Sequence, residues 1–179
     1  ASRIDLNGFA NNTWAALPIQ QHPTAQMVYG LISPPEYDPL FEERLKMDRW
    51  ELIGNIKDWV DIDDQRSGVF GGDENALYDR MEPRYRAKNA AFDSVEELRM
   101  VAGINDEVWS TFGEAFSIHT KNFKINVNAA DATMIRALIR AYTDPTLLSD
   151  QMLDNDVLPV LMVERSFLPG PFRSSSDFI

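Results

Sequence analysis

The chain has 179 residues, of which 28 are acidic and 17 are basic, so its formal net charge is −11. This excess of acidic side chains excludes a general nucleic-acid scaffold, because polyanion binding depends on clustered lysine and arginine. The chain has no cysteine, which excludes disulfides, thiol catalysis and cysteine-ligated zinc. Its 44% hydrophobic content is typical of a globular protein with a buried core, and it contains no apolar run of the roughly 18 residues needed to span a membrane.

Residues 1–37 are predicted to form a short strand followed by an irregular segment. Polar and apolar side chains alternate over residues 3–6, as they do in a half-buried strand. Farther along, the pattern favours one helix over residues 24–32, which Pro34 and Pro35 would end.

A helical domain is predicted over residues 38–165, and an acidic loop interrupts it over residues 58–75. An Asp-Pro pair that is typical of helix starts precedes a helix expected over residues 40–46. A second helix is expected over residues 48–60, because apolar side chains recur there at steps of three and four. They are Trp50, Ile53, Ile56 and Val60.

Residues 92–112 are predicted to be a helix-hairpin-helix unit. Asp93 or Ser94, placed before two glutamates, fits a capping box, and Gly103 ends the first helix. Either residue of the Asn-Asp pair that follows caps the second helix. Such hairpins bind phosphate through backbone N–H groups, so a DNA-binding module is an alternative function. The carboxylates that flank the turn would repel phosphate and argue against this alternative. They are Glu96, Glu97, Asp106 and Glu107.

The last third of the chain is predicted to contain one strand and two helices. Alternating side chains indicate a strand over residues 123–127, and Asn128 is expected to cap a helix that runs to Tyr142. The second helix is expected over residues 146–165, broken or restarted near Pro159.

A weak internal repeat closes the chain. The pattern of residues 92–98 recurs at residues 172–178, where a Phe-x-Ser start is again followed by an acidic and an apolar residue. Residues 166–179 are therefore predicted to begin a second, truncated helix-hairpin-helix element.

The acidic loop is the first candidate site, because six carboxylates fall within 17 positions that hold Arg66 as their one arginine. They belong to Asp58, Asp61, Asp63, Asp64, Asp73 and Glu74. Carboxylates at this spacing repel one another, and a hard cation relieves the repulsion. Calcium prefers oxygen ligands, and the loop glycines allow backbone carbonyls to turn inward. The spacing of Asp61, Asp63, Asp64 and Glu74 suits such an ion. A solvated acidic turn is the alternative.

Catalytic signatures are weak. His22 and His119 have no nucleophile or metal-ligand pattern beside them. Asp58 and Asp61 are spaced as an acid/base pair, so a hydrolase is a further alternative, but no substrate cleft is specified. Catalysis therefore has little support from these residues.

Several segments, taken in order, resemble one protein family. They are residues 3–7 (RIDLN), 56–64 (IKDWVDIDD), 72–78 (GDENALY), 85–89 (YRAKN), 92–104 (FDSVEELRMVAGI) and 124–130 (KINVNAA). Their order and spacing are similar to those of minor pseudopilin K of the type II secretion system, the general secretion pathway protein K family. The resemblance is closest over residues 48–140.

The resemblance implies a mainly α fold, in which a helical domain with helix-hairpin-helix (SAM-like) modules is inserted into a pilin-like protein. One or two short strands are expected, and residues 1–37 would be the part nearest the pilin sheet. Family members have an N-terminal membrane helix and a C-terminal strand region that have no counterpart in this sequence. The chain is therefore expected to be the periplasmic helical domain of a Gram-negative inner-membrane protein.

The resemblance also implies a role. Family members are non-enzymatic subunits at the tip of the periplasmic pseudopilus. They form a complex with minor pseudopilins I and J, take part in assembly and export, and are thought to engage secreted substrates. Their helical domain binds calcium, so Asp61, Asp63, Asp64 and Glu74 are the expected ligands of a structural Ca²⁺. Asn75 stands where the family tends to have Asp, which removes one possible ligand.

Overall fold

A computed structural model describes residues 2–11, 13–14, 17–67, 71–120 and 124–167 of the chain. Its regular elements are β1 (Ile4–Asp5), η1 (Leu6–Ala10), η2 (Ile19–Gln21), α1 (Pro23–Ile32), η3 (Pro35–Tyr37), η4 (Pro39–Leu45), α2 (Arg49–Val60), α3 (Asn75–Tyr78), η5 (Val95–Met100), α4 (Asp106–Phe112), η6 (Gly113–Ala115), β2 (Phe116–Ser117), α5 (Ala132–Tyr142), α6 (Asp150–Met152), η7 (Leu153–Val157) and α7 (Leu158–Phe167). The elements η4 and η7 are π-helices, and the other η elements are 3₁₀ helices. The predicted fold class, mainly α with short strands, is confirmed.

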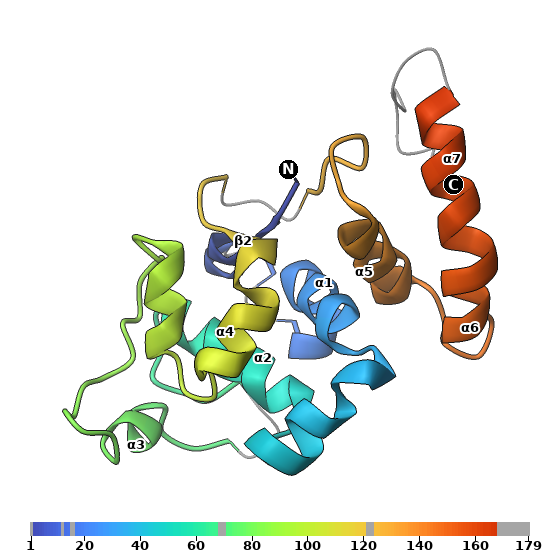
Figure 1. Ribbon diagram of the computed structural model, residues 1–179. Helices are drawn as coiled ribbons and strands as arrows, with labels where there is room; N and C mark the ends of the chain where they lie inside the picture. The colour runs from blue at the N-terminus through green and yellow to red at the C-terminus, as the bar shows by residue number, and fades with distance from the viewer. Residues whose placement is uncertain (1, 12, 15–16, 68–70, 121–123, 168–179) are drawn as a thin grey trace.

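Helix α1 lies at the centre of the fold, between α2 and α5 (Figure 1). Seven of its ten residues are buried, so nearly the whole circumference of this helix is covered. Gly30 allows the close approach of α5, because a Cβ atom at this position would lie 2.1 Å from the carbonyl oxygen of Ala137. Strand β1 pairs with β2 in parallel, with Ile4 opposite Phe116, and joins the start of the chain to the segment after α4.

Helix α2 leads to the acidic loop, and its start follows the sequence pattern. Asp48 caps the helix, since its side chain accepts a hydrogen bond from the Trp50 N–H at 2.7 Å. The last nine residues of the helix are all buried, which places its C-terminal end inside the protein. The helix predicted over residues 48–60 is confirmed, and the first side chain of the acidic loop, Asp58, is held rigidly.

The strand predicted over residues 123–127 is wrong for residues 124–127, which form an irregular segment and a turn; Phe123 lies outside the described residues. The Asn126 side chain accepts a hydrogen bond from the Asn128 N–H at 3.1 Å, and the backbone carbonyl of Asn126 accepts one from the Ala129 N–H at 3.0 Å. This local turn competes with strand pairing. The predicted cap at Asn128 is also wrong, because Asp131 caps α5 by accepting from the Met134 N–H at 2.8 Å.

The helix predicted over residues 146–165 with a break near Pro159 is instead a continuous helical run, α6–η7–α7, that begins at Asp150. A π-turn at Leu153–Val157 precedes Pro159. Proline has no backbone N–H to donate, and the wider turn allows the helix to continue without that hydrogen bond. In Figure 1 this run forms one edge of the molecule, beside α5. Ser166 and Phe167 end α7, and residues 168–179 of the predicted second element lie outside the described residues.

Within the described residues, no helix combines the length and apolarity that a membrane span requires. The predicted boundary at residue 37 stays a prediction.

Candidate metal centre

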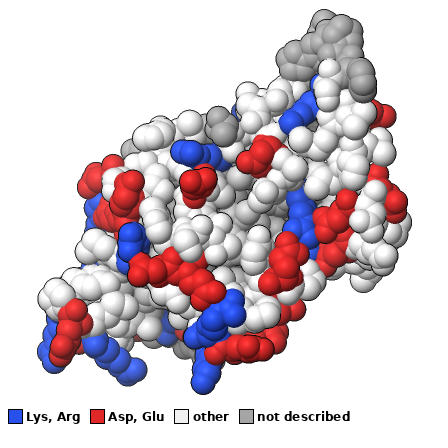
Figure 2. Space-filling view, viewed as in Figure 1, with Lys and Arg blue, Asp and Glu red and all other residues white. Residues whose placement is uncertain are grey.

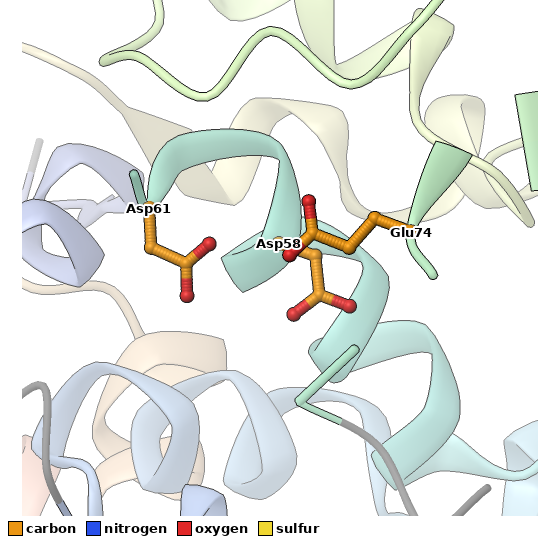
Figure 3. A group of neighbouring side chains, drawn as sticks. All are labelled: Asp58, Asp61 and Glu74. Atoms are coloured by element: carbon orange, nitrogen blue, oxygen red, sulfur yellow. The ribbon is translucent and has the colours of Figure 1, made fainter. Parts of the chain in front are cut away.

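Three carboxylates converge at the end of α2. One oxygen each from Asp58, Asp61 and Glu74 lies within 4.8 Å of the others. Figure 3 shows Glu74 pointing from the α3 side toward Asp58, while Asp61 turns inward from the end of α2. The three oxygens therefore face one small space between α2 and the segment that precedes α3.

The acidic loop reverses direction to bring Glu74 back to α2. Gln65 and Asp73 form an antiparallel bridge, and the Arg66 N–H donates to the carbonyl of Gly72 at 3.0 Å. Gly72 has a φ of 104°, which only glycine adopts readily. The predicted role of the loop glycines in turning the backbone agrees with this geometry.

Of the three carboxylates, Glu74 has the least favourable environment for a negative charge. Its side chain is fully buried, and neither carboxylate oxygen has a hydrogen-bond partner among the described residues. Burial, followed by repulsion from Asp58, Asp61, Asp63 and Asp64, raises the pKa of Glu74 to about 9. A buried carboxylate without a donor requires either a proton or a cation.

The other two carboxylates are partly neutralised by neighbouring groups. Asp58 is 2% exposed and accepts a hydrogen bond from the Ser67 N–H at 2.8 Å, while burial raises its pKa to about 6. Asp61 forms an ion pair with Lys57, yet burial still raises the pKa of Asp61, and its Oδ1 has no partner. Lys57 also donates to the Ser67 hydroxyl at 2.7 Å.

These residues fit a calcium ion by the chemistry of their donors. All three side chains offer hard oxygen atoms, and a divalent cation between them would relieve both the repulsion and the unpaired burial of Glu74. A carboxylate coordinates such an ion through one or both of its oxygens, and backbone carbonyls or water molecules complete the coordination shell. The arrangement favours an oxygen-ligated cation over a transition metal, since it includes neither sulfur nor imidazole.

Two of the four predicted ligands, Asp61 and Glu74, belong to this group, and two lie outside it. Asp63 is exposed and accepts from the Gln65 N–H at 2.8 Å, and Asp64 accepts from the Asn89 side chain at 3.1 Å. The third member, Asp58, belonged to the acidic loop but not to the predicted ligand set. Asp58 lies three residues before Asp61, the residue that caps the C-terminal end of α2, and this spacing was the available signal.

The hairpin over residues 92–112 has the predicted order of helix, turn and helix, but its first helix is the 3₁₀ element η5. Gly103, with a φ of 92°, makes the turn, and Asn105 caps α4 by accepting from the Val108 N–H. Three basic groups near this turn are paired with carboxylates: Arg99 with Asp106, Lys88 with Glu97, and Arg44 with Glu107. This pairing leaves little positive charge for a phosphate.

Comparison with known proteins identifies the family. The family model for type II secretion system protein K matches residues 2–113, so the match extends into the segment before residue 48, where the resemblance was loose. Type II secretion system protein K of Aeromonas hydrophila is 26% identical over 101 residues, which are 56% of this chain and 30% of that protein.

A solved structure shares the fold. The chain aligns with the GspK–GspI–GspJ complex of the enterotoxigenic Escherichia coli type 2 secretion system at a TM-score of 0.60 and 20% identity. The alignment covers 87% of this chain and 55% of the solved chain, so the sequence spans about half of that chain and less than a third of the Aeromonas relative. With the family model matching well over half of its residues, this chain belongs to the type II secretion system protein K family.

Proposed function

We propose that this chain acts as a structural, non-enzymatic part of a minor pseudopilin at the tip of the type II secretion pseudopilus, where it takes part in assembly and protein export. Membership in the protein K family supports this role. The chain would lie in the periplasm as a domain of a Gram-negative inner-membrane protein, reaching the membrane only through an N-terminal helix outside this sequence.

The proposed partners are the sibling minor pseudopilins I and J, together with secreted proteins. The solved relative of this fold was obtained as a GspK–GspI–GspJ complex, which supports the same partners here. Nucleic acid is not a proposed partner, because the charge is −11 and the cations beside the hairpin are paired.

The assembly role is tested by purification from cells that produce protein K containing this chain together with its I and J siblings. We expect an affinity tag on protein K to retain both siblings through size-exclusion chromatography, because the solved relative of this fold was obtained as a complex of all three. An unrelated pseudopilin carrying the same tag is the control. Recovery of an I–J pair that never contains protein K would contradict the proposed function.

We further propose that Ca²⁺ stabilises the chain at the acidic cluster. The observation that carries this proposal is the fully buried Glu74 carboxylate, which lacks a hydrogen-bond partner and faces Asp58 and Asp61. The ion would tie the end of α2 to the start of α3 and so hold the acidic loop closed. Its role would be structural.

Calcium should raise the melting temperature of the chain. Extracellular calcium modules have dissociation constants of about 10⁻⁴ to 10⁻³ M, so about 10 mM calcium should add about 1 to 3 kcal/mol of stability. For a chain of this size the gain corresponds to a rise of about 3 to 10 °C. Scanning calorimetry with calcium, with magnesium and with a chelator measures it. An unchanged melting temperature in all three would overturn the metal proposal.

A further inference from the structure

Three arginines on one loop lack partners. Arg80, Arg84 and Arg86 are exposed, and within the described part of the chain they make no hydrogen bond or ion pair. Most other described cations are paired with carboxylates, namely Arg44, Arg49, Lys57, Arg66, Lys88, Arg99, Arg136 and Arg140. The three therefore form a local concentration of free guanidinium groups, which we name the arginine loop (residues 79–88).

The backbone of the arginine loop is anchored although it has no regular structure. The Tyr85 hydroxyl donates to the carbonyl of Met100 at 2.7 Å, and the Tyr85 ring packs against the rings of Tyr78 and Trp59. Met81 and Ala87 also pack against the core. Inward-facing residues thus alternate with exposed arginines. Because the backbone is already ordered, little conformational entropy of the loop is lost when its guanidinium groups bind a ligand.

The end of the arginine loop is fixed to the acidic loop. The Asn89 side chain donates to the carbonyl of Asp63 and to the carboxylate of Asp64, both at 3.1 Å. Asn89 itself has a φ of 50°, a conformation that asparagine tolerates better than most residues. This second anchor supports a rigid platform.

The arginine loop is a positive island on a negative protein. It contains the three arginines, Lys88, which is paired with Asp93 and Glu97, and two acids, Asp79 and Glu82, so the formal charge of residues 79–88 is +2, compared with −11 for the whole chain. Neither acid forms an ion pair with the arginines. In Figure 2, basic groups project at the lower left, where α3 and the following loop lie in Figure 1.

Guanidinium groups in this setting favour carboxylates carried by a protein. Arginine forms two parallel hydrogen bonds with a carboxylate, and arginine is enriched at protein interfaces. An extended polyanion such as DNA or a membrane surface would also meet the acidic surface around the loop and be repelled by it. A short acidic segment of a protein contacts the positive island alone.

We propose that the arginine loop is a docking surface for an acidic segment of a partner protein. Its guanidinium groups bind Asp or Glu side chains of that segment, and the anchored backbone sets their spacing. The inference requires neither the metal nor the pseudopilin role, so it can fail or succeed separately from them.

Fluorescence anisotropy with a labelled glutamate decapeptide tests the docking surface on the whole chain. The double variant Arg80→Gln/Arg84→Gln should weaken binding about tenfold, because two exposed carboxylate pairs are lost. The matched control is Arg3→Gln/Lys46→Gln, which removes from other places two exposed cations that form no ion pair with any described residue, and which changes the net charge equally. We expect the control to bind within about twofold of wild type at about 0.15 M salt.

Two results would overturn the proposal. Equal weakening in both variants would show that net charge alone controls binding. Tighter binding of a short DNA duplex or of phosphatidylglycerol vesicles than of the decapeptide, with the same dependence on Arg80 and Arg84, would assign the loop to phosphate groups instead. Circular dichroism of each variant verifies that folding is unchanged.

Discussion

Without calcium, the Glu74→Gln variant should be more stable than wild type at neutral and alkaline pH. Burial raises the pKa of Glu74 from its ordinary value of 4.5 to about 9. The folded state therefore holds a proton that the unfolded state releases, and wild-type stability is complete below 4.5 and lost as the pH rises toward 9. At about pH 7 this loss amounts to about 3 kcal/mol, which solvent screening at the loop reduces to about 2. Glutamine does not titrate, so the variant avoids this loss of stability.

The same substitution should abolish most of the response to calcium, because a neutral amide replaces a charged ligand. Denaturant unfolding at about pH 5 and pH 8 in metal-free buffer measures the first effect, which should be several times larger at the higher pH because only a small part of the loss has occurred at about pH 5. Melting with added calcium measures the second. Asp73→Asn is a suitable control, since Asp73 is exposed, adjacent in sequence and outside the cluster.

The two effects separate the possible roles of Glu74. If the cluster is a solvated turn, Glu74→Gln changes neither the apo stability nor the calcium response. If Glu74 has a packing role only, the variant is less stable at both pH values and keeps its calcium response. Either result would contradict the assignment of Glu74 as a buried ligand.

Local signals predicted the helices that begin with strong caps. The predicted start of α2 at residue 48 is confirmed, and of the two caps considered for α4 the structure uses Asn105; in both helices the cap side chain accepts a backbone N–H. The π-turn before Pro159 and the 3₁₀ form of η5 were not predictable in this way. The spacing of apolar residues located these helices, but over so few residues it does not distinguish an α-helix from a 3₁₀ or a π-helix.

The failed strand at residues 124–127 shows the limit of alternation as evidence. The alternating side chains are present, but residues 124–127 pair with no strand among the described residues. Asn126 then forms its own turn. A short alternating pattern is weak evidence for a strand, because local hydrogen bonds between a side chain and the backbone can form a turn in its place.

Chemical composition predicted the acidic loop as a candidate site, whereas the fold decided which carboxylates meet. Asp58 was counted among the carboxylates of the acidic loop but not among the predicted ligands, whereas Asp63 was. The structure buries Asp58 and exposes Asp63. Burial of a carboxylate depends on tertiary packing, so a count of acidic residues could not rank them.

Acid should destabilise the chain through His22, which is the second large effect. Its side chain is 1% exposed, lies against Phe9 with ring centroids 5.0 Å apart, and has no hydrogen-bond partner at either ring nitrogen among the described residues. Burial, followed by the positive charge of Lys57, lowers the pKa of His22 from 6.5 to about 4. The N-terminus of α1, which follows His22 directly, also disfavours a second positive charge.

The sign of the effect follows from these pKa values. Between about pH 6.5 and 4 the unfolded chain binds a proton at His22 that the folded chain does not, so stability is complete above 6.5 and is lost as the pH falls toward 4. Over this range the loss should reach about 2 kcal/mol after allowance for screening. His22→Met fills a similar volume without a titrating group and should lose less stability in acid than wild type.

Urea unfolding at about pH 7 and pH 4.5 measures the difference, and the comparison between proteins cancels the carboxylates that titrate in the same range. His119→Asn is the matched control, because His119 is the other histidine of the chain and is exposed. The control should lose as much stability in acid as wild type. Equal losses of stability in acid for wild type and His22→Met would contradict this prediction, because they would show that protonation of His22 costs no stability. A buried ring beside Lys57 and a helix N-terminus should make that protonation unfavourable.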